Sequence, residues 1–175
     1  MESALVNAGP LIVLGKLNRL HLLTDLYPGL KVPVAVFREV VTEGLAQGMS
    51  EALTVRLYLE HHRIPLVEVS EAALEAFTPA AVLGAGERQV LALAHDLPGT
   101  LALLDDEDAR EEARRIRVPV KGTLGVLAQA CRRGLLPLEE LRLLLFEIAA
   151  RPDIWISPKL CRQVLAEVER APAKD

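Results

Sequence analysis

Short polar residues stand at the ends of apolar strand patterns in this 175-residue chain, and they are the first candidates for chemistry. The set comprises Asn7, Asp105, Asp106 and Thr123. Ligands of open parallel sheets bind beyond the carboxyl ends of the strands, and an apolar core avoids polar groups of this kind. The pattern therefore predicts a metal or phosphate site at this edge of a sheet.

Two glutamates join this set from predicted helices that follow loops. Glu39 lies on the side of its helix opposite the apolar face, and Glu87 comes directly after the turn Gly84-Ala-Gly86. Carboxylates brought within a few ångströms repel one another, so their clustering requires a divalent cation or shared protons. Because every donor is an oxygen, the predicted cation is Mg²⁺ or Mn²⁺.

Hydrolysis of a phosphodiester is the chemistry that needs this arrangement. A metal ion lowers the pKa of a bound water and shields the charge that develops on the phosphate. A carboxylate that is not bound to the metal can accept the proton of that water.

The same residues also have purely structural interpretations. Asp105 and Asp106 precede a predicted helix, where acidic side chains cap the helix and complement its dipole, and Glu87 stands at a similar place. Glu39 could be a solvated position on an amphipathic helix. Asn7 could be a turn residue. None of these residues identifies a catalytic site when it is taken alone.

Alternating strand and helix patterns position the candidate residues. Strands are predicted at residues 4–6, 30–32, 65–69, 100–104 and 118–120. Helices are predicted between them, with a loop at residues 44–50, and further helices follow at residues 124–133, from 137 to about 149, and after Ser157-Pro158. Short connections and right-handed crossovers imply an α/β fold with a parallel sheet covered by helices on both faces. With no long linker or repeat, we predict a single domain over residues 1–175, with the helices from about 137 extending its core.

Composition agrees with this fold and limits the partners. Hydrophobic residues make up 51% of the chain but aromatic residues only 3%, so the core must consist of Leu, Val, Ile and Ala, which suits buried parallel strands. The net charge of −4 argues against a protein that coats nucleic acid non-specifically. Any phosphate contact must therefore be local, and the arginines at 114, 115, 117, 132 and 133 are the best candidates.

The cysteines and the amino terminus indicate the compartment. Cys131 and Cys161 lie in helical patterns without a short CxxC spacing, as expected of free thiols in a reducing environment. No basic segment followed by a cleavable apolar run begins the chain, and no apolar stretch is long enough to span a bilayer. We therefore expect a soluble, cytoplasmic protein without membrane contact.

These segments, taken in order, resemble the PIN domain family, and within it a group of small prokaryotic PIN-like proteins related to toxin ribonucleases. The resemblance rests on the motifs Leu5-Val-Asn-Ala-Gly-Pro-Leu-Ile12, Val32-Pro-Val-Ala-Val-Phe-Arg-Glu-Val-Val41, Leu83-Gly-Ala-Gly-Glu87, Leu103-Leu-Asp-Asp-Glu-Asp-Ala-Arg110 and Gly122-Thr-Leu-Gly-Val-Leu127. It implies a three-layer α/β/α sandwich with a central parallel sheet of about five strands. It also implies ribonuclease activity that depends on Mg²⁺ or Mn²⁺, RNA as substrate, an antitoxin-type protein partner and a homodimer.

The resemblance also assigns roles to individual residues. Glu39, Glu87 and Asp106 match the family's catalytic, metal-binding carboxylates, and Asp105 and Asp108 flank the last of them. The remaining assignments are Asn7 as a further metal ligand that also contacts the substrate, and Thr123 as the residue that positions water or phosphate.

One position departs from the family pattern and keeps two alternatives open. Asn7 stands where most active members have an aspartate, and its neutral oxygen binds a divalent cation less strongly than a carboxylate does. The first alternative is a catalytically silent PIN-like module that binds RNA or a protein partner. The second is a phosphoacceptor signalling domain, but its acidic pair would follow the first strand, where this chain has Asn7.

Overall fold

A computed structural model describes residues 3–170, and the first of its two compact units, which ends at Thr123, contains a five-stranded sheet. The strands are β1 (Ser3–Val6), β2 (Gly29–Pro33), β3 (Leu66–Val67), β4 (Leu101–Leu103) and β5 (Val120–Lys121). All neighbouring strands are parallel, in the order β3-β2-β1-β4-β5. The predicted parallel sheet of about five strands is thereby confirmed, although β3 is shorter than predicted and β5 begins two residues later.

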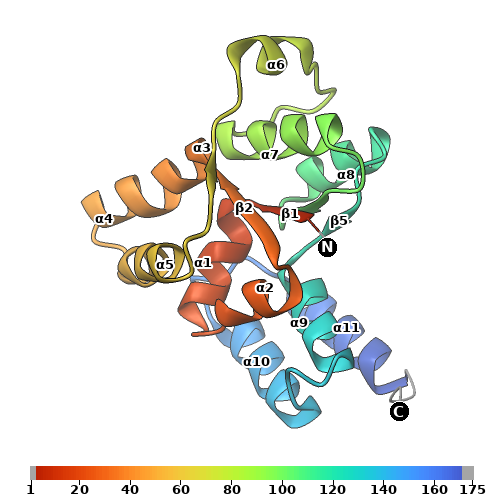
Figure 1. Cartoon of the computed structure of the whole chain (residues 1–175). Coiled ribbons are helices and arrows are strands. Elements are labelled where there is room, and N and C mark those ends of the chain that lie inside the picture. The colour runs from red at the N-terminus through yellow and green to blue at the C-terminus, as the bar shows by residue number, and fades with distance from the viewer. Residues whose placement is uncertain (1–2, 171–175) are drawn as a thin grey trace. The chain divides into compact units, whose positions relative to one another are not determined.

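Helices cover both faces of this sheet. In the first unit they are α1 (Ala8–Lys16), α2 (His21–Leu26), α3 (Val34–Phe37), the π-helix η1 (Arg38–Glu43), α4 (Gly44–Ala46), α5 (Ser50–His61), α6 (Glu71–Ala76), α7 (Ala85–Asp96) and α8 (Glu107–Arg115). In Figure 1, α7 and α8 lie on one side of the strands, and α1 and α2 lie on the other. The arrangement is the predicted α/β/α sandwich.

The central strands explain where the polar residues end up. Ala4, Leu5 and Val6 of β1 are at most 1% exposed, because helices on both faces shield a strand that is apolar throughout. The chain first forms β1, then adds β2 and β3 on one side of it, and then adds β4 and β5 on its other side. Such a reversal opens a crevice at the carboxyl ends of the two strands that flank it. Asn7 follows β1 and Asp105 follows β4 shortly after, so both are placed at this crevice.

The segment after α3 corrects one prediction. A loop was predicted at residues 44–50, but the helical backbone continues through η1 and α4 as far as Ala46. Gly44 costs a helix only about 1 kcal/mol relative to alanine. A Cβ added at Gly44 would lie 2.9 Å from the Cβ of Ala52, so the glycine allows α4 to pack closely on α5. Here tertiary packing outweighs the local turn signal.

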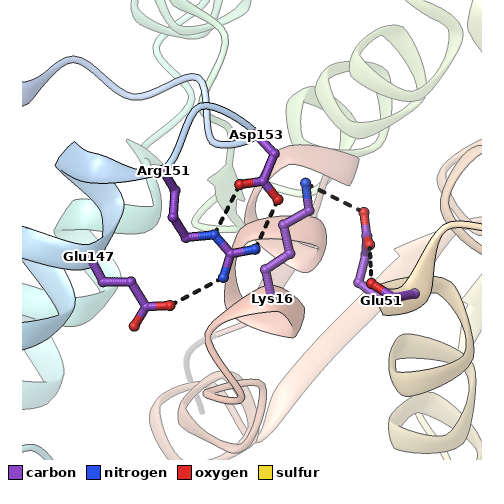
Figure 2. A network of polar contacts seen from close by, with 6 residues as sticks. Lys16, Glu51, Glu147, Arg151 and Asp153 are labelled. Atoms are coloured by element: carbon purple, nitrogen blue, oxygen red, sulfur yellow. Dashed lines mark hydrogen bonds and ion pairs between the residues drawn. The ribbon is translucent and has the colours of Figure 1, made fainter.

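The second unit begins at Leu124 and is helical. Its helices are α9 (Thr123–Arg132), α10 (Leu138–Ala150) and α11 (Pro158–Arg170), close to the predicted ranges. Arg151 follows α10 and holds Asp153 Oδ2 at 2.8 Å and Glu147 Oε1 at 3.1 Å (Figure 2). Arg142 Nη2 lies 2.8 Å from Glu169 Oε1, which joins α10 to α11. Whether the two units form one domain, as the sequence suggests, stays a prediction.

An ion pair between two helices and the state of the two thiols complete the description of residues 3–170. Lys16 Nζ lies 3.7 Å from Glu51 Oε1 and links α1 to α5 (Figure 2). Cys131 and Cys161 are free thiols, and Cys161 is buried. Between residues 3 and 170, no helix combines the length and the apolar character that crossing a membrane requires.

Candidate functional site

Asn7 is a buried amide with an unsatisfied oxygen. It occupies the N-cap position of α1, but its side chain makes no capping hydrogen bond. Its side chain is only 6% exposed, and within residues 3–170 the buried Oδ1 has no hydrogen-bond partner. Such an atom costs about 1–3 kcal/mol unless a water or an ion satisfies it. Asn7 therefore presents an acceptor that is suited to a bound ligand.

A glycine in the first turn of α7 shows what Asn7 faces. A Cβ added at Gly86 would lie 2.8 Å from Asn7 Oδ1, 3.2 Å from Glu39 Oε2 and 3.0 Å from Val36 Cγ2. The two oxygens thus border one small space, which only a residue without a side chain leaves open. We interpreted this glycine as part of a flexible turn, but it is buried inside the helix. A glycine inside a helix is unfavourable by propensity. Its presence at this position was the available signal that side chains of other segments approach the helix backbone closely.

Glu39 belongs to the π-helix η1. π-Helical segments are rare in proteins, and those that occur often lie at functional sites. The pKa of Glu39 is raised, first by partial burial of its carboxyl group and then by the charges of Glu87 and Glu43. The structure therefore brings Glu39 and Glu87 within electrostatic reach of each other.

Glu87 connects Glu39 to the acidic segment after β4. Burial raises the pKa of Glu87, and the charges of Asp106 and Asp108 raise it further, while the hydrogen bond from Gly84 N, 2.8 Å from Glu87 Oε2, opposes this shift. Asp106 is the N-cap of α8, where its Oδ1 accepts from Ala109 N at 2.9 Å. The capping roles expected of Glu87 and Asp106 are thus present. A carboxylate keeps further lone pairs for other ligands.

Asp105 and Thr123 form a separate buried contact. Asp105 Oδ1 accepts from Thr123 N at 2.7 Å, and Asp105 Oδ2 accepts from Thr123 Oγ1 at 2.6 Å. Burial raises the pKa of Asp105, while these hydrogen bonds and the charge of Arg110 act in the opposite direction. Thr123 is fully buried, so any effect of its hydroxyl on a substrate would pass through Asp105.

The candidate residues do not form a ready coordination shell. Within residues 3–170, no group of three or more His, Cys, Asp or Glu side chains is arranged so that it could hold a metal ion. The oxygens that do border a common space are those of Asn7 and Glu39. Oxygen donors of this kind suit Mg²⁺ or Mn²⁺. A cation there would also offset the charge repulsion that raises the pKa of Glu39 and of Glu87, so Asn7 and Glu39 fit a divalent ion in donor type and charge, while the other carboxylates would have to move to complete its ligands.

The arginines that we predict as phosphate contacts are not the ones that the structure places beside the candidate site. Arg114 Nη1 lies 3.0 Å from Glu107 Oε1, and Arg115 Nε lies 3.0 Å from Glu112 Oε2, so both already have carboxylate partners. Arg110 was not among our phosphate candidates, yet its charge acts on the pKa of Asp105. Arg110 comes four residues after Asp106, the N-cap of α8. Residues with this spacing lie on the same face of a helix, so the sequence could have indicated that Arg110 lies near the acidic segment.

Comparison with known proteins identifies the family. A family model described as a PIN domain matches residues 3–170. The chain belongs to the PIN domain family. No curated protein matches the chain. A PIN domain has a nuclease-type fold, and the match includes every candidate residue from Asn7 to Thr123 as well as the helices of the second unit. The predicted resemblance is confirmed.

Proposed function

We propose that this PIN domain is an endoribonuclease that hydrolyses RNA phosphodiesters with bound Mg²⁺ or Mn²⁺. The observation that carries the proposal is the buried, unsatisfied Oδ1 of Asn7, which borders the same space as Glu39 Oε2 beside the first turn of α7. A group of carboxylates beside an unused neutral acceptor is chemically suited to a hard divalent cation.

In this proposal Glu39, Glu87 and Asp106 hold the ion, with Asn7 as a neutral ligand and Asp105 and Asp108 in support. The ion supplies charge neutralisation and lowers the pKa of a water when it is bound. The raised pKa values of Glu39 and Glu87 reflect burial and repulsion between carboxylates, which a bound ion would offset, so the proton of the attacking water would pass to a carboxylate that is not bound to the ion.

The reaction balances with water as the only co-substrate. The water oxygen forms a bond to phosphorus, one P–O ester bond breaks, and the proton held by the carboxylate passes to the departing alkoxide. Asp105 would act indirectly, by fixing the turn before α9 through its two hydrogen bonds with Thr123.

Asp106→Asn tests the mechanism without removing the helix cap, because asparagine caps helices as well as aspartate does. We expect this variant to lose Mn²⁺-stimulated cleavage of a labelled RNA. Glu107→Gln is the matched control, since it removes one negative charge from the adjacent exposed position, which pairs with Arg114. Cleavage by Asp106→Asn at the rate of the parent protein would refute the proposed site.

The alternative is a catalytically silent module that binds RNA or a protein partner. It is favoured by the amide at position 7 and by the net charge of −4. Calorimetry with Mn²⁺ separates the two functions, because a silent module would bind no metal at millimolar concentration. Under the nuclease proposal, Asn7→Asp increases both metal affinity and cleavage.

The cellular setting is part of the same proposal. Small PIN-like ribonucleases resemble the toxin half of toxin–antitoxin pairs, so we propose an antitoxin-type protein partner, a homodimer and a cytoplasmic location. Leu143 and Phe146 on α10 are 70% and 74% exposed, which supports an apolar contact surface on this helix. Size-exclusion chromatography with light scattering tests the dimer, and a monomer at micromolar concentration would contradict it.

A further inference from the structure

Arg110 has hydrogen-bond donors that the protein leaves unused. Its Nε is buried and, within residues 3–170, has no hydrogen-bond partner. Glu107 Oε2 lies 3.8 Å from this nitrogen, which is too long for a hydrogen bond. About a quarter of the Arg110 side chain remains exposed, so part of it faces solvent.

Neighbouring arginines of α8 behave differently. Arg114 donates to Glu107 and Arg115 donates to Glu112. Their charges are therefore largely compensated by carboxylates of the same helix. Arg110 has a longer ion pair with Glu107 and an electrostatic interaction with Asp105, and of these three arginines it is the one with a buried donor nitrogen that has no acceptor within residues 3–170.

The turn before α9 holds the Arg110 guanidinium beside the candidate site. A Cβ added at Gly122 would lie 2.6 Å from Arg110 Nη1, 2.9 Å from Asp105 Oδ1 and 3.2 Å from the carbonyl oxygen of Leu104. Because Gly122 has no side chain, the arginine can pack over the backbone at the carboxyl ends of β4 and β5. The cation thus lies next to the acidic segment that begins with Asp105.

A site formed by carboxylates needs a compensating positive charge if it is to bind RNA. The carboxylates of Glu39, Glu87 and Asp106 repel a phosphodiester, and a protein of net charge −4 supplies no general attraction to compensate. A guanidinium presents two parallel N–H donors that match the oxygens of one phosphate. We propose that Arg110 is the phosphate-binding residue of this site and holds one backbone phosphate of single-stranded RNA beside the acidic segment that begins with Asp105.

This inference rests on the proposed function for its choice of ligand, and it is tested without catalysis. Binding of a short fluorescein-labelled oligouridylate is measured by fluorescence anisotropy in EDTA, so that neither metal nor cleavage contributes. Arg110→Ala should weaken binding about tenfold or more, as expected for the loss of a charge-assisted hydrogen bond. The slope of log affinity against log salt concentration should fall in magnitude by about 0.7, the value for one phosphate contact with a single strand.

Two further variants separate recognition from charge and from folding. Arg114→Ala removes the same charge from the same helix, and its affinity should change much less because Arg114 is already paired with Glu107. Arg110→Lys keeps the charge but not the planar fork, so it should keep the salt slope and recover only part of the affinity. The unfolding midpoint of each variant is measured alongside, and Arg110→Lys serves in place of the alanine variant if the latter does not fold.

Each outcome has a definite meaning. Equal affinity and equal salt slope for Arg110→Ala and the parent protein would overturn the role of Arg110 and leave the proposed nuclease intact. Failure of the parent protein to bind the probe would overturn it as well. Binding that depends on Arg110, combined with no cleavage in Mn²⁺, would support the phosphate contact and refute the nuclease.

Discussion

Thr123→Val tests the buried contact that fixes the turn before α9. Valine has nearly the shape of threonine but has no hydroxyl, so the substitution removes the 2.6 Å hydrogen bond to Asp105 Oδ2. The second bond, from Thr123 N to Asp105 Oδ1, is made by the backbone and should remain. Thr123 is fully buried, so water cannot readily replace the missing donor.

The expected loss follows from the kind of bond that is removed. A hydrogen bond to a charged group contributes about 1.5–3 kcal/mol to the free energy of unfolding. For a protein of this size, about 1 kcal/mol corresponds to a shift of 2–4 °C in the unfolding midpoint. We therefore expect Thr123→Val to unfold about 3–12 °C below the parent protein at a pH where Asp105 is ionised.

The loss should also depend on pH with a definite sign. The pKa of Asp105 is raised in the folded protein by burial, so the folded state binds this proton more tightly than the unfolded state does. The contribution of Asp105 to stability therefore decreases as the pH rises from the ordinary pKa of an aspartate to the raised one. The Thr123 hydroxyl opposes this shift, so its removal raises the pKa of Asp105 further. The difference between variant and parent should be largest at a pH where Asp105 is ionised and shrink as the pH falls and Asp105 becomes protonated.

Thermal unfolding followed by circular dichroism at several pH values measures these effects, and Thr123→Ser is the matched control. Serine keeps the hydroxyl and loses a methyl group, so its loss of stability should not vary with pH in this way. Equal stability of Thr123→Val and the parent protein across the pH range, or a loss that does not change as Asp105 titrates, would refute the assigned role of the hydroxyl.

Two further substitutions test other parts of the first unit. Gly86→Ala places a Cβ 2.8 Å from Asn7 Oδ1, so it should cost about 1–3 kcal/mol of stability by overpacking and reduce Mn²⁺ binding in calorimetry. Gly84→Ala is its control, because there the added Cβ meets only the flexible Glu87 carboxyl group at 3.4 Å. Equal effects of both changes would contradict the space assigned to the metal at Gly86. Glu112→Gln should destabilise the protein at neutral pH, because hydrogen bonds from Arg115 lower the pKa of this buried carboxyl group. That stability is present above the ordinary pKa of a glutamate and is lost as the pH falls through the lowered one. Urea unfolding should therefore show that the difference in stability between Glu112→Gln and the parent protein vanishes in acid. A difference that is independent of pH would contradict this origin.

The sequence alone determined the architecture and the location of the candidate site along the chain. Apolar runs of strand length separated by helical patterns leave few arrangements other than a parallel sheet covered on both faces. Polar residues directly after two such runs, Asn7 and Asp105, are local features that need no structure to be recognised. The family resemblance also follows from local motifs, and the match over residues 3–170 confirms it.

Tertiary structure decided what each polar side chain contacts. Asp105 is held by Thr123, 18 residues away, and not by its own helix. Gly86 leaves the space that Asn7 and Glu39 border, and Gly122 leaves room for Arg110. Each of these facts depends on the distance between segments remote in sequence, whereas periodicity and capping signals describe only neighbours along the chain. Propensity could identify the residues capable of chemistry, but only packing could assign them partners.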